Sequence, residues 1–209
     1  MIDLMQTVRN HPVLAIMRKI PDEDLLDYVQ AAIDGGVNFF EVALNTPNGP
    51  EQIEKLRKHF GDRILVGAGT VLSPNQAQNA VDHGAQFLLS PSCPEKVLAY
   101  CHKNGIAYMP GIMTPSDVGL CLEYGFSTLK LFPANCVSDQ LVRQLKGPFD
   151  HTEYVAIGGV TLADAPKYKA QGYLGLGVGS NLFSKSLVQA RNWQAASMEL
   201  KGYMDSIRG

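Results

Sequence analysis

The sequence predicts an α/β protein folded as a closed (β/α)8 barrel, and three observations support this prediction. Eight short apolar runs alternate with segments of helical character. Each interval between two runs is long enough for a helix of about ten residues and two short loops. The runs are apolar on both faces, as parallel strands covered by helices are. Eight such units in 209 residues match a barrel of the TIM type, whereas an open doubly wound sheet usually has about five or six strands.

The expected elements follow one another through the whole chain, which we predict to be a single domain over residues 1–209. An extra N-terminal helix covers residues 1–10, and a C-terminal helix covers 186–207. Between them, the eight predicted strands cover residues 13–17, 37–44, 64–69, 85–90, 106–111, 127–132, 153–159 and 173–179. No linker or low-complexity segment divides the chain.

Glycine and capping residues mark the ends of the predicted helices. A glycine precedes five of the strands, as in the stretches DGGVNFF and KNGIAYMP, and glycine tolerates the left-handed conformation in which many helices end. The pairs Ser73–Pro74 and Thr114–Pro115 mark helix starts, because Ser and Thr cap a helix and Pro fits its first turn. Thr161 is a further candidate cap. These signals place a helix between successive strands, as a barrel requires.

The composition argues against several classes of protein. The net charge of −2 provides no basic field for nucleic acid or an anionic membrane. No apolar run approaches the roughly 18 residues of a membrane span. The first ten residues mix charged and apolar side chains, so we expect no signal peptide and a cytoplasmic location. The cysteines at 93, 101, 121 and 136 form no CxxC pair, which favours free thiols over a zinc or redox site.

A lysine interrupts the sixth predicted strand, in the stretch STLKLF. Side chains alternate between the faces of a strand, so Lys130 and Phe132 share one face, and Leu129 and Leu131 share the other. The leucines suit the helix-covered outside, so we expect Lys130 to point into the barrel. A structural lysine would reach the rim or pair with Glu41. A catalytic lysine would attack a carbonyl and form a Schiff base, because burial lowers its pKa and frees the amine.

A glutamate interrupts the second predicted strand, in the stretch FFEVAL. If its face of the strand is the inner one, the Glu41 carboxylate reaches the same cavity as Lys130. Schiff-base chemistry needs a proton shuttle for dehydration of the carbinolamine and for cleavage of a C–C bond. A carboxylate partly buried among apolar residues suits that task. The alternative is a structural partner for Arg18 or Lys130.

The other strand ends predict contacts to anions. Gly158, Gly159 and Ser180 lie in the loops after the seventh and eighth strands, where barrels frequently bind phosphate. Ser180 could also cap the helix that follows. Arg18 ends the first strand and matches a carboxylate, and Thr70 after the third strand is a second contact. The alternatives are simple tight turns at the glycines and a surface role for Arg18.

The histidines argue against a metal site. They lie in helical or loop segments, and none ends a strand: His11, His59, His83, His102 and His151. A metal site in a barrel would need His or Asp ligands at the strand ends. We therefore expect neither a metal nor another cofactor.

The stretches that carry these residues resemble the aldolases of 2-keto-3-deoxy-6-phosphogluconate and 4-hydroxy-2-oxoglutarate, the KDPG/KHG aldolase family. The resemblance runs nearly end to end, through PVLAIMR, GGVNFFEVALNTP, ILVGAGTVLSPNQ, YMPGIMTPSD, TLKLFPA, IGGVTLAD and GLGVGSNLF. It implies a metal-free class I aldolase, a lyase that cleaves a phosphorylated 2-keto-3-deoxy acid to pyruvate and glyceraldehyde 3-phosphate. It also implies a homotrimer of barrels.

The resemblance implies a role for each candidate residue. Lys130 would form the Schiff base, and Glu41 would be the acid and base. The other residues would bind substrate: Arg18 and Thr70 the carboxylate, Gly158, Gly159 and Ser180 the phosphate, and Asn45, Pro110, Phe132 and Ile157 the rest of the pocket.

Two departures from the family pattern bear on the substrate. Asn45 stands where many phosphogluconate members have Arg, and Ile157 stands where many have Thr. Both look closer to the 6-phosphogalactonate branch, whose substrate differs at C4, and loose specificity that includes 4-hydroxy-2-oxoglutarate is a third option. The residues alone leave two more distant classes open. One is a sugar-phosphate isomerase or epimerase, and the other is a non-catalytic phospho-sugar binding protein.

Overall fold

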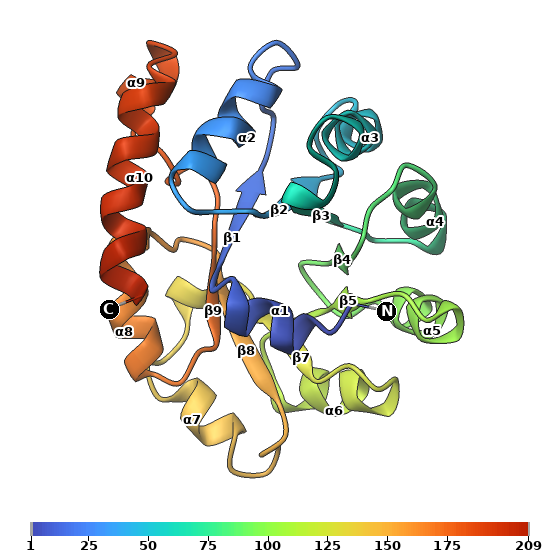
Figure 1. Cartoon of the computed structure of the whole chain (residues 1–209). Coiled ribbons are helices and arrows are strands. Elements are labelled where there is room, and N and C mark those ends of the chain that lie inside the picture. Colours follow the sequence, from blue (N-terminus) through green and yellow to red (C-terminus); the bar gives the residue numbers. More distant parts are fainter. Residues whose placement is uncertain (1, 209) are drawn as a thin grey trace.

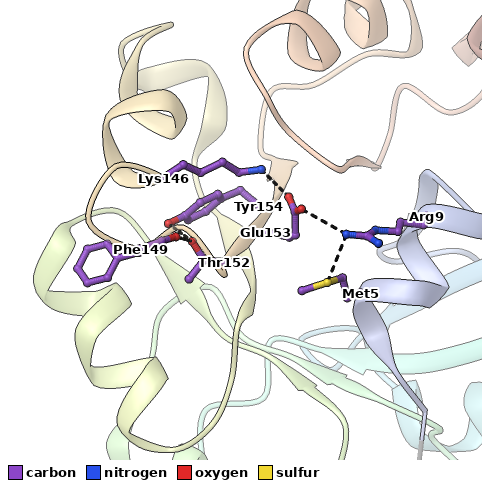
Figure 2. Close-up of polar contacts among 7 residues, drawn as sticks. All are labelled: Met5, Arg9, Lys146, Phe149, Thr152, Glu153 and Tyr154. Carbon is purple, nitrogen blue, oxygen red and sulfur yellow. Dashed lines mark hydrogen bonds and ion pairs between the residues drawn. The ribbon is translucent and has the colours of Figure 1, made fainter.

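The structure, a computed structural model that describes residues 2–208, is a ring of parallel strands surrounded by helices (Figure 1). The strands are β1 (Val13–Met17), β2 (Phe39–Ala43), β3 (Leu65–Gly69), β4 (Leu88–Leu89), β5 (Tyr108–Met109), β6 (Gly111–Ile112), β7 (Thr128–Leu131), β8 (Glu153–Ile157) and β9 (Gly175–Val178). The helices are α1 (Leu4–Asn10), α2 (Leu25–Asp34), α3 (Gly49–Phe60), α4 (Pro74–Asp82), α5 (Glu95–Asn104), α6 (Pro115–Glu123), α7 (Leu141–Leu145), α8 (Ala165–Ala170), α9 (Lys185–Gln189) and α10 (Trp193–Arg208). None of the helices within residues 2–208 is long and apolar enough to cross a membrane.

The strands close into a barrel through an interrupted fifth strand. Neighbouring strands are parallel, in the order β5-β4-β3-β2-β1-β9-β8-β7-β6. β5 pairs with β4 and β6 pairs with β7, so these two halves of one extended segment complete the ring. Pro110 separates the halves because it has no N–H for the ladder, but its carbonyl accepts a 2.9 Å hydrogen bond from the Lys130 N–H. The predicted (β/α)8 barrel is confirmed, with its fifth strand broken at Pro110 instead of continuous over 106–111.

Inward-facing side chains fill the barrel. They form one apolar cluster: Leu4, Val8, Leu14, Ile16, Phe39, Phe87, Leu89, Ala107, Met109, Val155 and Ile157. Leu4 and Val8 come from α1, the predicted N-terminal helix, which lies inside the ring of outer helices in Figure 1. Gly175 at the start of β9 allows this approach, because a Cβ there would lie 2.5 Å from Cγ1 of Val8. The helix therefore covers the amino-terminal end of the barrel and leaves the carboxyl-terminal end open.

The predicted capping residues begin helices in the structure. The Ser73 and Thr114 hydroxyl groups cap α4 and α6, each accepting a hydrogen bond from a backbone N–H three residues further on. Thr161 and Asp164 form a capping box ahead of α8. Such caps satisfy N–H groups that the first turn of a helix leaves unpaired.

The C-terminal segment differs from the predicted helix over 186–207. Two helices, α9 and α10, take its place, and Arg191 between them has a φ of 51°. The Arg191 side chain forms an ion pair with Asp24, with 2.7 Å between Nε and Oδ1. Because Asp24 immediately precedes α2, this contact ties the turn after α9 to the start of α2.

Candidate active site

Lys130 lies in the barrel interior, where the alternation of strand side chains places it. It is 4% exposed, and its Nζ lies 5.3 Å from the centre of the Phe132 ring. Burial lowers the pKa of Lys130, the Glu41 carboxylate partly opposes that change, and the Arg18 guanidinium adds to it. The net effect is to lower the pKa of Lys130. More of this amine is therefore neutral, and able to attack a carbonyl, than in a lysine exposed to water.

Glu41 is fully buried beside Lys130. Its Oε2 lies 3.9 Å from the Lys130 Nζ. Among residues 2–208, neither oxygen of this carboxylate has a hydrogen-bond partner. A buried carboxylate without hydrogen bonds costs stability, and such groups cluster at functional sites. A structural ion pair would be expected to satisfy these oxygens, so the arrangement favours a chemical role.

Gly69, the last residue of β3, provides the space for the Glu41 carboxylate. A Cβ at position 69 would lie 1.7 Å from Oε1 and 2.1 Å from Cδ of Glu41. Gly67 allows a different close approach, because its Cβ would lie 2.4 Å from the carbonyl oxygen of Phe87. Both glycines of β3 therefore allow close packing, and no pattern in the sequence revealed that Gly69 makes room for a catalytic candidate.

A cavity of about 640 Å³ opens at the carboxyl ends of the strands and includes Lys130. It brings together most of the residues predicted from the sequence: Arg18, Thr70, Lys130, Phe132, Ile157, Gly158, Gly159 and Ser180. Glu41 is not a lining residue, but its carboxylate lies 3.9 Å from the Nζ of Lys130, which is one. Within the described part of the chain, no cluster of three or more His, Cys, Asp or Glu side chains could hold a metal ion.

Asn45 and Pro110 do not line this cavity. Asn45 is exposed beyond the end of β2, and Pro110 is buried in the barrel wall between β5 and β6. Pro91, which follows β4, occupies a lining position instead. The pocket roles expected for Asn45 and Pro110 find no support in this geometry.

Thr70 and Arg18 lie at the rim of the cavity. Thr70 has a φ of 61°, which is unusual for a β-branched residue and is the kind of backbone strain found at functional sites. Arg18 is exposed, and its charge is close enough to affect the pKa of Lys130. A carboxylate beside the Lys130 amine could therefore meet both a guanidinium and a hydroxyl group.

The glycine pair after β8 forms a turn that other residues would obstruct. Gly158 and Gly159 have φ values of 99° and 68°. A Cβ at 159 would lie 2.0 Å from Nδ2 of Asn135. Ser180, after β9, is an exposed turn residue of the same cavity. It does not cap the next helix, because α9 begins only at Lys185, so the suggested capping role is wrong.

Several lining residues were not found from the sequence. They lie outside the strands or just beyond them: Lys19, Ile20, Tyr28, Pro91, Asn181, Phe183, Lys185, Val188 and Gln189. Apart from Tyr28 of α2 and Pro91 after β4, they lie in the loop after β1, in the loop after β9 or in α9. No local pattern in the sequence reports that arrangement.

Known proteins are similar to this chain in both sequence and fold. Residues 4–198 match the family of KDPG and KHG aldolases. The 2-dehydro-3-deoxy-6-phosphogalactonate aldolase of Escherichia coli (strain K12) is 32% identical over 206 residues, which cover 98% of this chain and 100% of that protein. The 2-dehydro-3-deoxy-phosphogluconate aldolase of Treponema pallidum (strain Nichols) is 34% identical over 80% of this chain and 79% of its own length.

Solved structures agree. The KDPG aldolase of Legionella pneumophila, with pyruvate captured as a covalent carbinolamine intermediate, superposes with a TM-score of 0.89. It is 26% identical, and the match covers 97% of this chain and 98% of that one. A buried lysine beside a buried carboxylate, at the open end of a barrel, is thus found in a chain with aldolase relatives. The chain belongs to the KDPG and KHG aldolase family.

Proposed function

We propose that this aldolase cleaves 2-keto-3-deoxy-6-phosphogluconate to pyruvate and glyceraldehyde 3-phosphate through a Schiff base on Lys130. The observation that carries the proposal is the 3.9 Å approach of the Glu41 carboxylate to the Nζ of Lys130, which lines an open cavity. This carboxylate has no hydrogen-bond partner within residues 2–208. The lowered pKa of Lys130 supports a nucleophile, and the buried carboxylate supports an acid and base.

The first half of the reaction forms the imine. The neutral Lys130 amine attacks the C2 carbonyl of the keto acid, while Arg18 and Thr70 bind the neighbouring carboxylate. Protons move from nitrogen to oxygen, and the carbinolamine hydroxyl leaves as water after Glu41 donates a proton to it. The product is a protonated imine between C2 and Lys130, and Glu41 is left as the carboxylate.

The second half cleaves the carbon chain. Glu41 removes the proton of the C4 hydroxyl, the C3–C4 bond breaks, and its electron pair moves to the iminium to give an enamine. Glyceraldehyde 3-phosphate leaves, and Glu41 returns its proton to C3 of the enamine. Water then hydrolyses the imine, which releases pyruvate and restores the Lys130 amine. Phosphate contacts from Gly158, Gly159 and Ser180 would hold the departing end.

Borohydride trapping tests the covalent step. The protein is incubated with pyruvate, treated with borohydride and digested for mass spectrometry. We expect a reduced pyruvyl group on Lys130, no adduct in Lys130→Met, and an unchanged adduct in Lys103→Ala, an exposed lysine of α5. No adduct on the folded wild-type protein would falsify the Schiff base. Turnover without an adduct would point to a sugar-phosphate isomerase or epimerase, and ligand binding without turnover to a binding protein.

The C4 epimer, 2-keto-3-deoxy-6-phosphogalactonate, is a second candidate substrate. The Escherichia coli relative that is named as an aldolase of this epimer is 32% identical, and the alignment covers 98% of the present chain. Ile157, which lines the cavity directly before the glycine pair, is an apolar side chain near the substrate path. Measuring kcat/KM for both epimers and for 4-hydroxy-2-oxoglutarate would rank the three substrates.

We also propose that the chain acts as one barrel domain, in a homotrimer, in the cytoplasm. The support is the family membership, together with the continuous match over residues 4–198. Sedimentation equilibrium of the purified protein would measure the assembly. A mass of one or two chains across the working concentration range would reject the trimer.

A further inference from the structure

The cavity carries more positive charge than the carboxylate site requires. Its cationic lining residues are Arg18, Lys19, Lys130 and Lys185, and no Asp or Glu is among the lining residues. The buried Glu41, 3.9 Å from the Lys130 Nζ, offsets the charge of that lysine alone. The chain as a whole has a net charge of −2, so the positive charge is local. A keto acid that also carries a phosphate brings about three negative charges at neutral pH. The cavity is therefore suited to an anion with two charged ends.

Lys19 lies beside the loop that carries Ser180. It follows β1, which pairs in parallel with β9, so the loops after these two strands are neighbours. The Lys19 backbone has a φ of 56°, and its N–H donates a 2.9 Å hydrogen bond to Oγ1 of the buried Thr46. The backbone at Lys19 is thus fixed, while its side chain has no hydrogen bond or ion pair within residues 2–208.

Lys185 lines the same cavity as Lys19 and Ser180. It is the first residue of α9, and Val188 and Gln189 of that helix also line the cavity, as expected for one helix face. Its side chain likewise has no hydrogen bond or ion pair within the described residues. Two exposed lysines, neither with a side-chain partner among residues 2–208, therefore line the cavity that also contains Ser180.

Residues on either side of α9 are tied to α2 and to the turn before it. The Phe183 ring packs edge-on against Tyr28 of α2, with 5.0 Å between the ring centres. Arg191, after the helix, pairs with Asp24 at 2.7 Å and with Glu23 at 3.7 Å. Figure 1 shows α9 next to α2. These contacts fix the backbone that carries Lys185, so the lysine belongs to a formed wall of the cavity.

We propose that Lys19 and Lys185 are specificity residues that bind the substrate phosphate together with the Gly158–Gly159 and Ser180 turns. Backbone N–H groups in such turns can orient a phosphate but carry no net charge. A phosphate monoester has a charge of about −1.5 to −2 at pH 7, which two lysines match. The pair thereby makes the enzyme prefer phosphorylated over unphosphorylated keto acids. This inference rests on the aldolase activity proposed above.

The test compares a phosphorylated substrate with its unphosphorylated counterpart, 2-keto-3-deoxygluconate. The variants are Lys19→Ala, Lys185→Ala and the double substitution, with Lys103→Ala as the control. We expect each single change to lower kcat/KM for the phosphorylated substrate about tenfold, the effect of losing one charge-assisted contact, mainly through KM. Values for the unphosphorylated substrate should stay within about twofold, and Lys185→Arg should recover most of the loss.

Two results would overturn the assignment. One is an equal loss on both substrates, which would indicate a structural role. The other is no loss on either. Calorimetric titration with inorganic phosphate gives a readout that needs no catalysis, and we expect weaker binding to the double variant than to Lys103→Ala. Pyruvate trapping on Lys130 should persist in every variant. Its absence in the wild type would count against the Schiff base and not against the phosphate contacts.

Discussion

Glu41 occupies space that exists because residue 69 has no side chain. In Gly69→Ala the new methyl group would overlap the carboxylate, with 1.7 Å between Cβ and Oε1. We expect Glu41 to be displaced, kcat to fall by about 100-fold or more, and the free energy of unfolding to fall by about 1–3 kcal/mol. Steady-state kinetics and urea unfolding would measure both effects.

Gly119→Ala is the matched control for that substitution. Gly119 lies in α6, and nothing lies within 4 Å of a Cβ added there. Alanine in a helix interior should raise stability by about 0.5–1 kcal/mol and leave turnover unchanged. Wild-type kcat in Gly69→Ala would show that the Glu41 carboxylate does not depend on this gap.

The charges around Lys130 predict how pyruvate trapping depends on pH. The amine reacts when neutral, so the trapping rate should rise with pH and level off above the pKa of Lys130. Burial lowers that pKa, so the plateau should begin below about pH 10, near which an ordinary lysine titrates. Glu41 favours the charged amine, so Glu41→Gln should move the midpoint to lower pH. Arg18→Ala removes a like charge and should move it to higher pH.

Midpoints, rather than absolute rates, decide this prediction, because both side chains also have proposed roles in the reaction. Rates normalised to their own plateau would be compared across the three proteins. A midpoint near pH 10.4 in all of them would mean that Lys130 behaves like a lysine in water. Shifts of the same sign in both variants would contradict the charge assignment.

Among the secondary-structure elements, α9 has the most direct effect on the shape of the cavity. Arg191→Ala removes its ion pair with Asp24. The pair is partly exposed, so the unfolding free energy should change by less than about 1 kcal/mol. The KM for phosphorylated substrate should nevertheless rise several-fold, because Lys185 is no longer held at the rim. Lys167→Ala, which breaks an exposed ion pair with Asp139 on another side of the barrel, should leave KM unchanged.

The elements themselves could largely be predicted from the sequence. Apolar runs, glycines at helix ends and Ser-Pro or Thr-Pro pairs at helix starts are local signals. They placed the strands and the caps at Ser73 and Thr114 correctly. Two features of the secondary structure were not predicted. The break at Pro110 depends on which N–H the ladder needs at that point, and the division of 186–207 depends on the contact of Arg191 with α2. Both are tertiary effects that a local pattern does not contain.

For the molecule as a whole, a cationic cavity on a chain of net charge −2 predicts salt-sensitive catalysis. Exposed charges are screened beyond about 10 Å at 0.1 M salt and beyond about 3 Å at 1 M. We expect kcat/KM for the phosphorylated substrate to fall several-fold over this range. The unphosphorylated substrate, which carries only a carboxylate, should be affected less. Equal salt dependence for both would show that the field of the cavity does not act on the phosphate.

Barrel closure also explains how much of the site the sequence could predict. Once eight parallel strands form a ring, their carboxyl ends meet, so Arg18, Thr70 and Lys130 must lie near one another. Ser180 was placed correctly at the rim, although not as a helix cap. Lys19 and Lys185 were missed because the loop after β1 and helix α9 determine their positions.

The gap at Gly69 also determines which residues would have to be introduced into another barrel to reproduce this site. Grafting only the lysine and the carboxylate would leave the carboxylate without a place to lie. The transferable unit is three positions on three strands: a lysine, a carboxylate and a residue without a side chain. In a barrel whose third strand ends in a larger residue, that residue would first have to be replaced by glycine.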